Sequence, residues 1–139
     1  MKKIYLFISL VFVICIAVTL FAANYTNLFY KGTFLNEKDV IAKWGSEEFT
    51  ENRWKTSTIP ERTRMVASLL RNKQKYIGKT NIEIREIFGD PDSHYLSEAL
   101  PAYTIQENTP AGGERWDVVF LINKENKIID IRVHRNYPE

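Results

Sequence analysis

The sequence contains one cysteine, Cys15, and two histidines among its 139 residues. A single cysteine cannot form an intramolecular disulfide, and it cannot supply the ligands of a cysteine-based zinc cluster. A folded part without such cross-links must be held together by its hydrophobic core. The small number of histidines also limits the metal or acid–base sites that the chain can build.

The sequence also lacks an excess of charge of either sign. It has 19 Lys and Arg residues against 17 Asp and Glu, and Lys2 and Lys3 are the only charged residues among the first 24. The rest of the chain is therefore neutral in formal charge. Binding to nucleic acid requires clustered positive charge, so no nucleic-acid partner is expected.

A long apolar run occupies residues 4–23 and contains no charged residue. Its length is close to the roughly 20 residues that cross a bilayer as a helix. Lys2 and Lys3 precede it, which favours a cytoplasmic N-terminus and export of the remainder. We expect residues 1–24 to be a single-pass signal anchor in a bacterial cytoplasmic membrane, with the C-terminal domain on the periplasmic side.

Two other fates of this segment stay open. Signal cleavage with secretion favours small residues before the cleavage site, but Phe21 lies two positions before Ala23 and Leu20 two before Ala22. Lipidation would use Cys15, which follows Ile14 in the middle of the run.

Residues 25–57 read as a connector with aromatic residues near its start and one possible short helix. Asn36 can cap that helix over residues 37–44, and Gly45 can end it. Residues 49–57 show no clear period, so an extended segment anchored by Phe49 and Trp54 is expected there.

Residues 58–139 form the predicted folded domain, and two helices in it have marked ends. Thr58 and Glu61 make a capping box with Pro60 in the first turn, and this helix should run to about Asn72.

The second helix is predicted over residues 81–88. Thr80 and Glu83 make its capping box, Gly89 takes the position after its end, and Pro91 prevents continuation.

A period of two replaces the helical period after Pro91. Strands are expected around Tyr95 and around residues 103–105, and residues 116–122 and 129–133 alternate as a hairpin with one buried face. The order of elements predicts an α+β fold in which two helices pack on one face of a small antiparallel sheet of three or four strands.

Residues 78–92 read G-K-T-x-x-E-I-x-x-I-F-G-x-P-D, and a second block includes Trp54-Lys55, Arg62 and residues 65–70. This combination resembles the SmpA/OmlA (BamE-like) domain of small bacterial envelope proteins, which are often lipid-anchored. The resemblance covers residues 62–133. It implies an α+β fold that acts through protein contacts without catalysis or a cofactor, and a related fold is that of β-lactamase inhibitor proteins.

Catalytic or metal-binding chemistry would have to combine Asp92, His94 and His134, and their spacing does not show that they meet. Gly78-Lys79-Thr80 matches the end of a P-loop, but position 73, where the upstream glycine belongs, is Lys. We therefore predict no catalytic residue, no metal and no cofactor.

Candidate protein-contact residues are of two kinds. Arg62, Arg64 and Arg71, with Lys73 and Lys75, could face an acidic partner or an anionic membrane surface, or they could form a solvated helix face. Tyr103 and Trp116 could form a contact surface on the sheet, or they could pack in the core.

The expected function is non-catalytic binding of another envelope or secreted protein. The leading version is an accessory protein of envelope or outer-membrane assembly, as the resemblance implies. The alternative is an inhibitor or immunity-type protein that blocks a secreted enzyme or toxin, and a hydrolase or metal enzyme is the third class.

Overall fold

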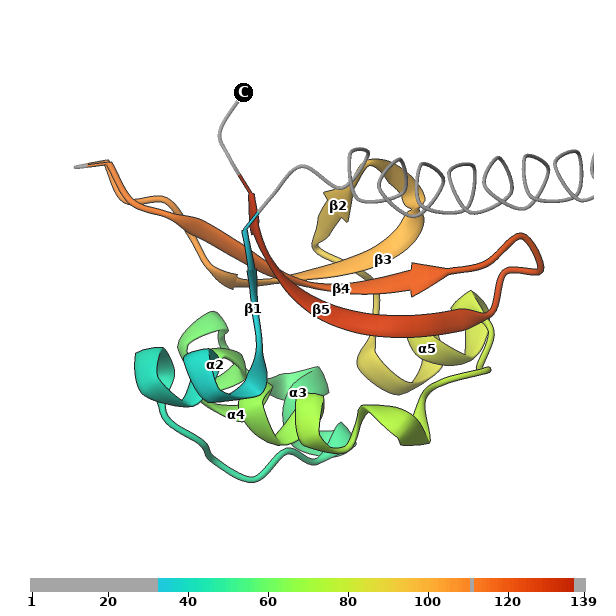
Figure 1. Ribbon diagram of the computed structural model, residues 1–139, viewed down its shortest axis with the longest axis horizontal. Coiled ribbons are helices and arrows are strands. Elements are labelled where there is room, and N and C mark those ends of the chain that lie inside the picture. The colour runs from blue at the N-terminus through green and yellow to red at the C-terminus, as the bar shows by residue number, and fades with distance from the viewer. Residues whose placement is uncertain (1–32, 111, 137–139) are drawn as a thin grey trace, which may run out of the picture. The chain divides into compact units, whose positions relative to one another are not determined.

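Four α-helices and five β-strands make up the part of the chain that the computed structural model describes, residues 33–110 and 112–136 (Figure 1). The helices pack against a five-stranded antiparallel sheet, which confirms the predicted α+β class. In chain order the elements are β1 (Phe34–Leu35), α2 (Glu37–Trp44), α3 (Glu51–Thr56), α4 (Ile59–Arg71), the 3-10 turn η1 (Lys73–Lys75), α5 (Asn81–Phe88), β2 (Ser93–Tyr95), β3 (Ser97–Gln106), β4 (Arg115–Ile122) and β5 (Ile128–Asn136).

The strand order is β1-β5-β4-β3-β2, and every neighbouring pair is antiparallel. The predicted hairpin is the central pair β4–β5. The prediction of three or four strands is wrong because β1 also joins the sheet, with Phe34 opposite His134 and Leu35 opposite Val133. Two residues are too few to show an alternating pattern, so the sequence carries no sign of this strand.

Both predicted capping boxes are present. The Glu61 carboxylate accepts hydrogen bonds from the backbone N–H and the hydroxyl of Thr58, at 2.7 and 2.8 Å. Glu83 makes the same two contacts with Thr80 at the start of α5. These bonds satisfy backbone donors that have no partner within the helix, and they explain why α4 and α5 begin where the sequence predicts.

The prediction of two helices is also too low, and the expected extended segment at residues 49–57 is wrong. Helix α3 lies there, with the Thr50 hydroxyl accepting from the N–H of Arg53 and the Trp54 side chain fully buried. Six residues give less than two turns, which is too short for a helical period to be read. The short helix α2 is present as predicted, capped by Asn36 and ended by Gly45.

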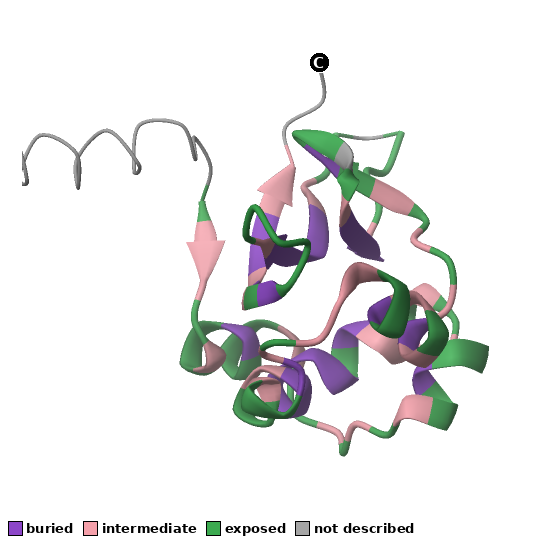
Figure 2. Ribbon diagram, turned by 90° about the vertical axis from the view of Figure 1, so that its right-hand side faces the viewer, coloured by how far each residue is buried: buried purple, intermediate pink, exposed green. Residues whose placement is uncertain are grey.

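The main core lies between the helices and the sheet, and its centre is aromatic. Phe88, the last residue of α5, contacts five rings at centroid distances from 4.9 to 5.9 Å, those of Phe49, Trp54, Tyr76, Tyr103 and Phe120. Figure 2 shows buried residues on the facing sides of the two layers. Val40 and Trp54, which fall in the predicted connector, belong to this core.

The second face of the sheet also carries buried side chains, among them Val119, Leu121 and Ala102. The rings of Tyr95 in β2 and His134 in β5 lie 4.4 Å apart, although strands β3 and β4 lie between β2 and β5 in the sheet. The sheet therefore curls across this face. Figure 1 shows β2 and the beginning of β3 turned to the side opposite the helices.

No helix within residues 33–110 and 112–136 is long and apolar enough to cross a membrane. The predicted anchor, residues 4–23, lies outside the described residues.

Gly89 is the position where the end of α5 depends on glycine. Its φ of 86° and ψ of −177° fall in a region that residues with a side chain rarely adopt. We expect Gly89→Ala to lower the free energy of unfolding by about 1–3 kcal/mol, measured by urea denaturation of the full-length chain in detergent micelles. Glu86→Ala, an exposed change on the same helix, is the control, and equal stability of the two variants would contradict the assignment.

Candidate functional site

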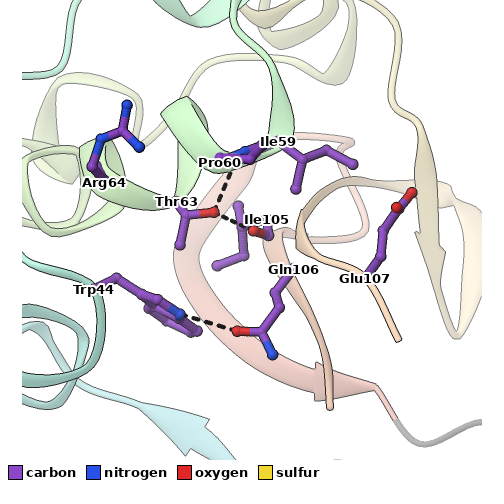
Figure 3. Close-up of a pocket in the computed structure, with 8 residues that line it drawn as sticks. All are labelled: Trp44, Ile59, Pro60, Thr63, Arg64, Ile105, Gln106 and Glu107. Atoms are coloured by element: carbon purple, nitrogen blue, oxygen red, sulfur yellow. Dashed lines mark hydrogen bonds between the residues drawn. The ribbon is translucent and has the colours of Figure 1, made fainter. Parts of the chain in front are cut away.

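A groove of about 450 Å³ lies where the end of α2, the first turns of α4 and the end of β3 meet (Figure 3). This volume is within the range of pockets that hold small ligands or partner side chains. The residues that line it are Trp44, Ile59, Pro60, Thr63, Arg64, Ile105, Gln106 and Glu107.

Apolar side chains form one part of the groove. Ile59 and Pro60 are the first two residues of α4, where the missing N–H of proline costs no hydrogen bond. Ile105 lies where the register of β3 against β4 shifts, so that Thr104 pairs with Asp117 and Gln106 with Trp116. This bulge sets Ile105 against the first turns of α4, as Figure 3 shows.

Trp44 forms another part of the groove and is held by contacts on two sides. Its Nε1–H donates to Oε1 of Gln106 at 3.0 Å, and Nε2 of Gln106 donates to the carbonyl oxygen of Glu114 at 2.9 Å. Its ring packs edge-on against Trp116, with the centroids 5.7 Å apart. Lys43 Nζ lies 5.4 Å from the Trp44 ring centroid. The aromatic wall is therefore fixed before any partner binds.

Thr63 closes the base of the groove, and its hydroxyl, which has a single proton to donate, lies against two backbone carbonyl oxygens. The hydroxyl lies 2.8 Å from the carbonyl oxygen of Ile59 and also contacts the carbonyl oxygen of Ile105. Thr63 is buried, so its hydroxyl proton is a donor that the Ile105 carbonyl can share with the Ile59 carbonyl in place of water. Thr63 lies four residues after Ile59, among the apolar positions of α4. This spacing is the sequence signal from which its burial could have been predicted.

The outer edge of β3 near the groove is closed by side chains. The pairing of β2 with β3 ends at Ser93 opposite Ala102. Beyond that point an Asp92 carboxylate oxygen accepts the Thr104 N–H at 2.7 Å, while Thr63 contacts the Ile105 carbonyl. These contacts occupy groups to which another strand would otherwise bind.

The predicted basic contact residues are each paired with a carboxylate. Arg62 pairs with Asp92, and the other pairs are Arg64–Glu47 (2.6 Å), Arg71–Glu37 (2.9 Å), Lys73–Asp130 (2.6 Å) and Lys75–Glu51 (2.7 Å). The surface around α4 is consequently a network of opposite charges and not a basic patch. This arrangement does not support its predicted role toward an acidic partner or an anionic membrane.

Tyr103 and Trp116 are buried, with relative exposures of 0% and 3%. The Tyr103 hydroxyl donates to the carbonyl oxygen of Gly89 at 2.8 Å, and Trp116 Nε1 donates to Glu114 at 2.9 Å. Burial raises the pKa of the Tyr103 hydroxyl well above its ordinary value. The proposed contact surface at these two residues is therefore corrected: both side chains pack in the core.

The three residues that a catalytic or metal site would need have different surroundings. Asp92 is engaged by Arg62 and Thr104, His94 is exposed, and His134 is buried between the rings of Phe34 and Tyr95. In the described ranges no group of three or more His, Cys, Asp and Glu residues could hold a metal ion.

Comparisons of the chain with protein-family models, with curated proteins and with solved structures find no match. The resemblance to the SmpA/OmlA domain therefore depends on the motif around α5 and the block in α3 and α4.

The hydroxyl of Thr63 gives a stability test of the groove. Thr63→Val keeps the shape of the side chain but leaves the buried Ile105 carbonyl without this donor, so we expect a loss of about 1–3 kcal/mol in the free energy of unfolding. Thr63→Ser keeps the hydroxyl and is the matched control. Urea denaturation in micelles measures both, and a more stable Val variant than Ser variant would show that the hydroxyl is not needed.

Asp130 gives a pH test. Burial alone would raise the pKa of its carboxyl, but hydrogen bonds from Lys73 and Arg132 outweigh burial and hold this pKa below its ordinary value. Because the folded pKa is the lower one, the stabilisation is complete above the unfolded pKa of about 3.9 and is lost as the pH falls through the folded pKa.

We therefore expect Asp130→Asn to lower stability at neutral pH and to flatten the acid limb of the stability curve below about pH 4. Urea midpoints measured from pH 7 down to about pH 2 test this. Glu86→Gln, on an exposed face of α5, is the control. An acid limb of unchanged steepness in Asp130→Asn would contradict the role of the carboxylate.

Proposed function

We propose that this chain is a non-catalytic protein-binding module of the bacterial cell envelope. Residues 4–23 hold it in the cytoplasmic membrane as a signal anchor, and its folded domain lies on the periplasmic side. The groove between α2, α4 and β3 is the contact site for its protein partner. The observation that carries the proposal is the apolar lining of this groove beside an immobilised Trp44.

The state of the charged side chains supports binding over catalysis. Catalytic acids and bases need pKa values suited to proton transfer and positions within reach of a common reacting atom. Here Glu61 and Glu83 cap helices, Asp92 ties β3 to Arg62, and Asp130 holds two cations. These groups stabilise the fold, and the ion pairs of Asp92 and Asp130 are made with different cations, Arg62 for the first and Lys73 and Arg132 for the second.

The more specific role is that of an accessory protein in envelope or outer-membrane assembly. It is supported by the G-K-T-x-x-E-I-x-x-I-F-G-x-P-D motif, which resembles the SmpA/OmlA domain, and the α+β fold agrees with that resemblance. Fold and motif alone do not specify a partner, so the role must be tested by identifying what the groove contacts.

The test is site-specific photo-crosslinking of the tagged full-length chain in native membranes. A photoreactive phenylalanine analogue replaces Arg64 at the rim of the groove, and the control carries it at Lys124 in the turn between β4 and β5. We expect crosslinks to subunits of an envelope-assembly complex from position 64 and none from position 124.

The other outcomes contradict parts of the proposal separately. A single secreted enzyme or toxin crosslinked at position 64 would identify an inhibitor or immunity-type protein. The absence of any crosslink at position 64 would contradict the binding role of the groove. Recovery of a mature chain that lacks residues 1–23 would contradict the anchor.

A further inference from the structure

We propose that the groove accepts one aliphatic side chain of its protein partner, beside a partner Lys or Arg that pairs with Glu107, without extension of the sheet. This rests on the proposed function, because it names the chemistry of the partner at the same site. The inference combines three features of the groove: the closed edge of β3, the committed polar groups of its lining, and the charge of Glu107.

The closed edge of β3 decides how a partner can bind. Strand addition needs backbone N–H and C=O groups that are available along the edge. At this edge the Thr104 N–H donates to Asp92 and the Ile105 carbonyl is in contact with the Thr63 hydroxyl. A partner strand would have to displace both contacts, so an inserted side chain is favoured over an added strand.

The lining of the groove decides which side chain fits. Two polar groups of the lining are already used, because Trp44 Nε1 donates to Gln106 and the Thr63 hydroxyl lies against two carbonyl oxygens. A polar side chain inserted among Ile59, Pro60 and Ile105 would lose its water without gaining a partner, which costs free energy. An aliphatic side chain loses no hydrogen bond and gains apolar contact.

The charges at the rim decide what lies next to that side chain. Arg64 pairs with Glu47, and Lys43, which lies over the Trp44 ring, pairs with Glu114. Glu107 is exposed at the other rim, and no ion pair of its carboxylate occurs among residues 33–110 and 112–136. The charge that complements this rim is therefore positive.

The test uses the full-length chain in detergent micelles and three synthetic peptides at millimolar concentration. They are Gly-Gly-Leu-Arg-Gly-Gly, Gly-Gly-Leu-Glu-Gly-Gly and Gly-Gly-Ser-Arg-Gly-Gly. Nuclear magnetic resonance follows the indole N–H of Trp44 and the methyl groups of Ile59 and Ile105, and the fully buried Trp54 indole is the internal control. We expect shifts of the groove signals with the Leu-Arg peptide that clearly exceed those with the other two.

A variant separates the two parts of the proposal. Glu107→Gln should weaken binding of the Leu-Arg peptide about two- to fivefold, as expected for one exposed ion pair, and should leave the Leu-Glu peptide no weaker. Lys124→Gln, far along the chain in the β4–β5 turn, should change neither.

Four results would overturn the inference or a part of it. Equal shifts from the Leu-Arg and Leu-Glu peptides would remove the role of Glu107, and equal shifts from the Leu-Arg and Ser-Arg peptides would remove the aliphatic anchor. Perturbed backbone amides along Thr104–Gln106 with little change at Trp44 would indicate strand addition. Crosslinks at position 64 without any peptide shift would refute only the proposed side-chain chemistry and leave the binding role of the groove standing. Peptide shifts without crosslinks at position 64 would contradict the binding role of the groove and leave its side-chain preference standing.

Discussion

The aromatic packing around Phe88 is the interaction on which the rest of the fold depends. One ring at the end of α5 contacts side chains from α3, from the segment before it, from the turn after η1 and from strands β3 and β4. Burial of large aromatic side chains and their edge-to-face contacts are among the strongest contributions to a small core. Gly89 ends α5 directly after Phe88. The residue that turns the backbone and the residue that fills the core are therefore adjacent in the motif.

The sequence predicted the elements that local chemistry defines. Helices α4 and α5 have capping boxes and apolar stripes, and the β4–β5 hairpin alternates clearly, so all three were identified from neighbouring residues. Helix α3 and strand β1 were missed because six and two residues are too short for a period. The burial of Tyr103 and Trp116 could not be separated from exposure by alternation alone, because the sheet has buried side chains on both of its faces.

The candidate groove is harder to predict, since its lining comes from positions 44, 59, 60, 63, 64 and 105–107. No sequence period connects these positions. They are brought together in the fold by the bulge in β3 and the Trp44–Gln106 hydrogen bond. The same applies to charge. The cations around α4 look like a patch in the sequence, but carboxylates as distant as Glu37 and Asp130 neutralise them. Partner recognition through a neutral surface relies on shape and apolar contact more than on long-range attraction.

The pairing of β1 with β5 has a consequence for the order in which the domain can form. Phe34 and His134 lie opposite each other, so the first and last strands of the described chain are neighbours, and β5 is also the partner of β4. Contacts between such distant positions form late and slow folding. A chain that emerges from its N-terminal end can form α4 and α5 early, but its sheet lacks an inner strand until β5 has emerged. Completion of this sheet therefore waits until β5 is available to pair with both β4 and β1.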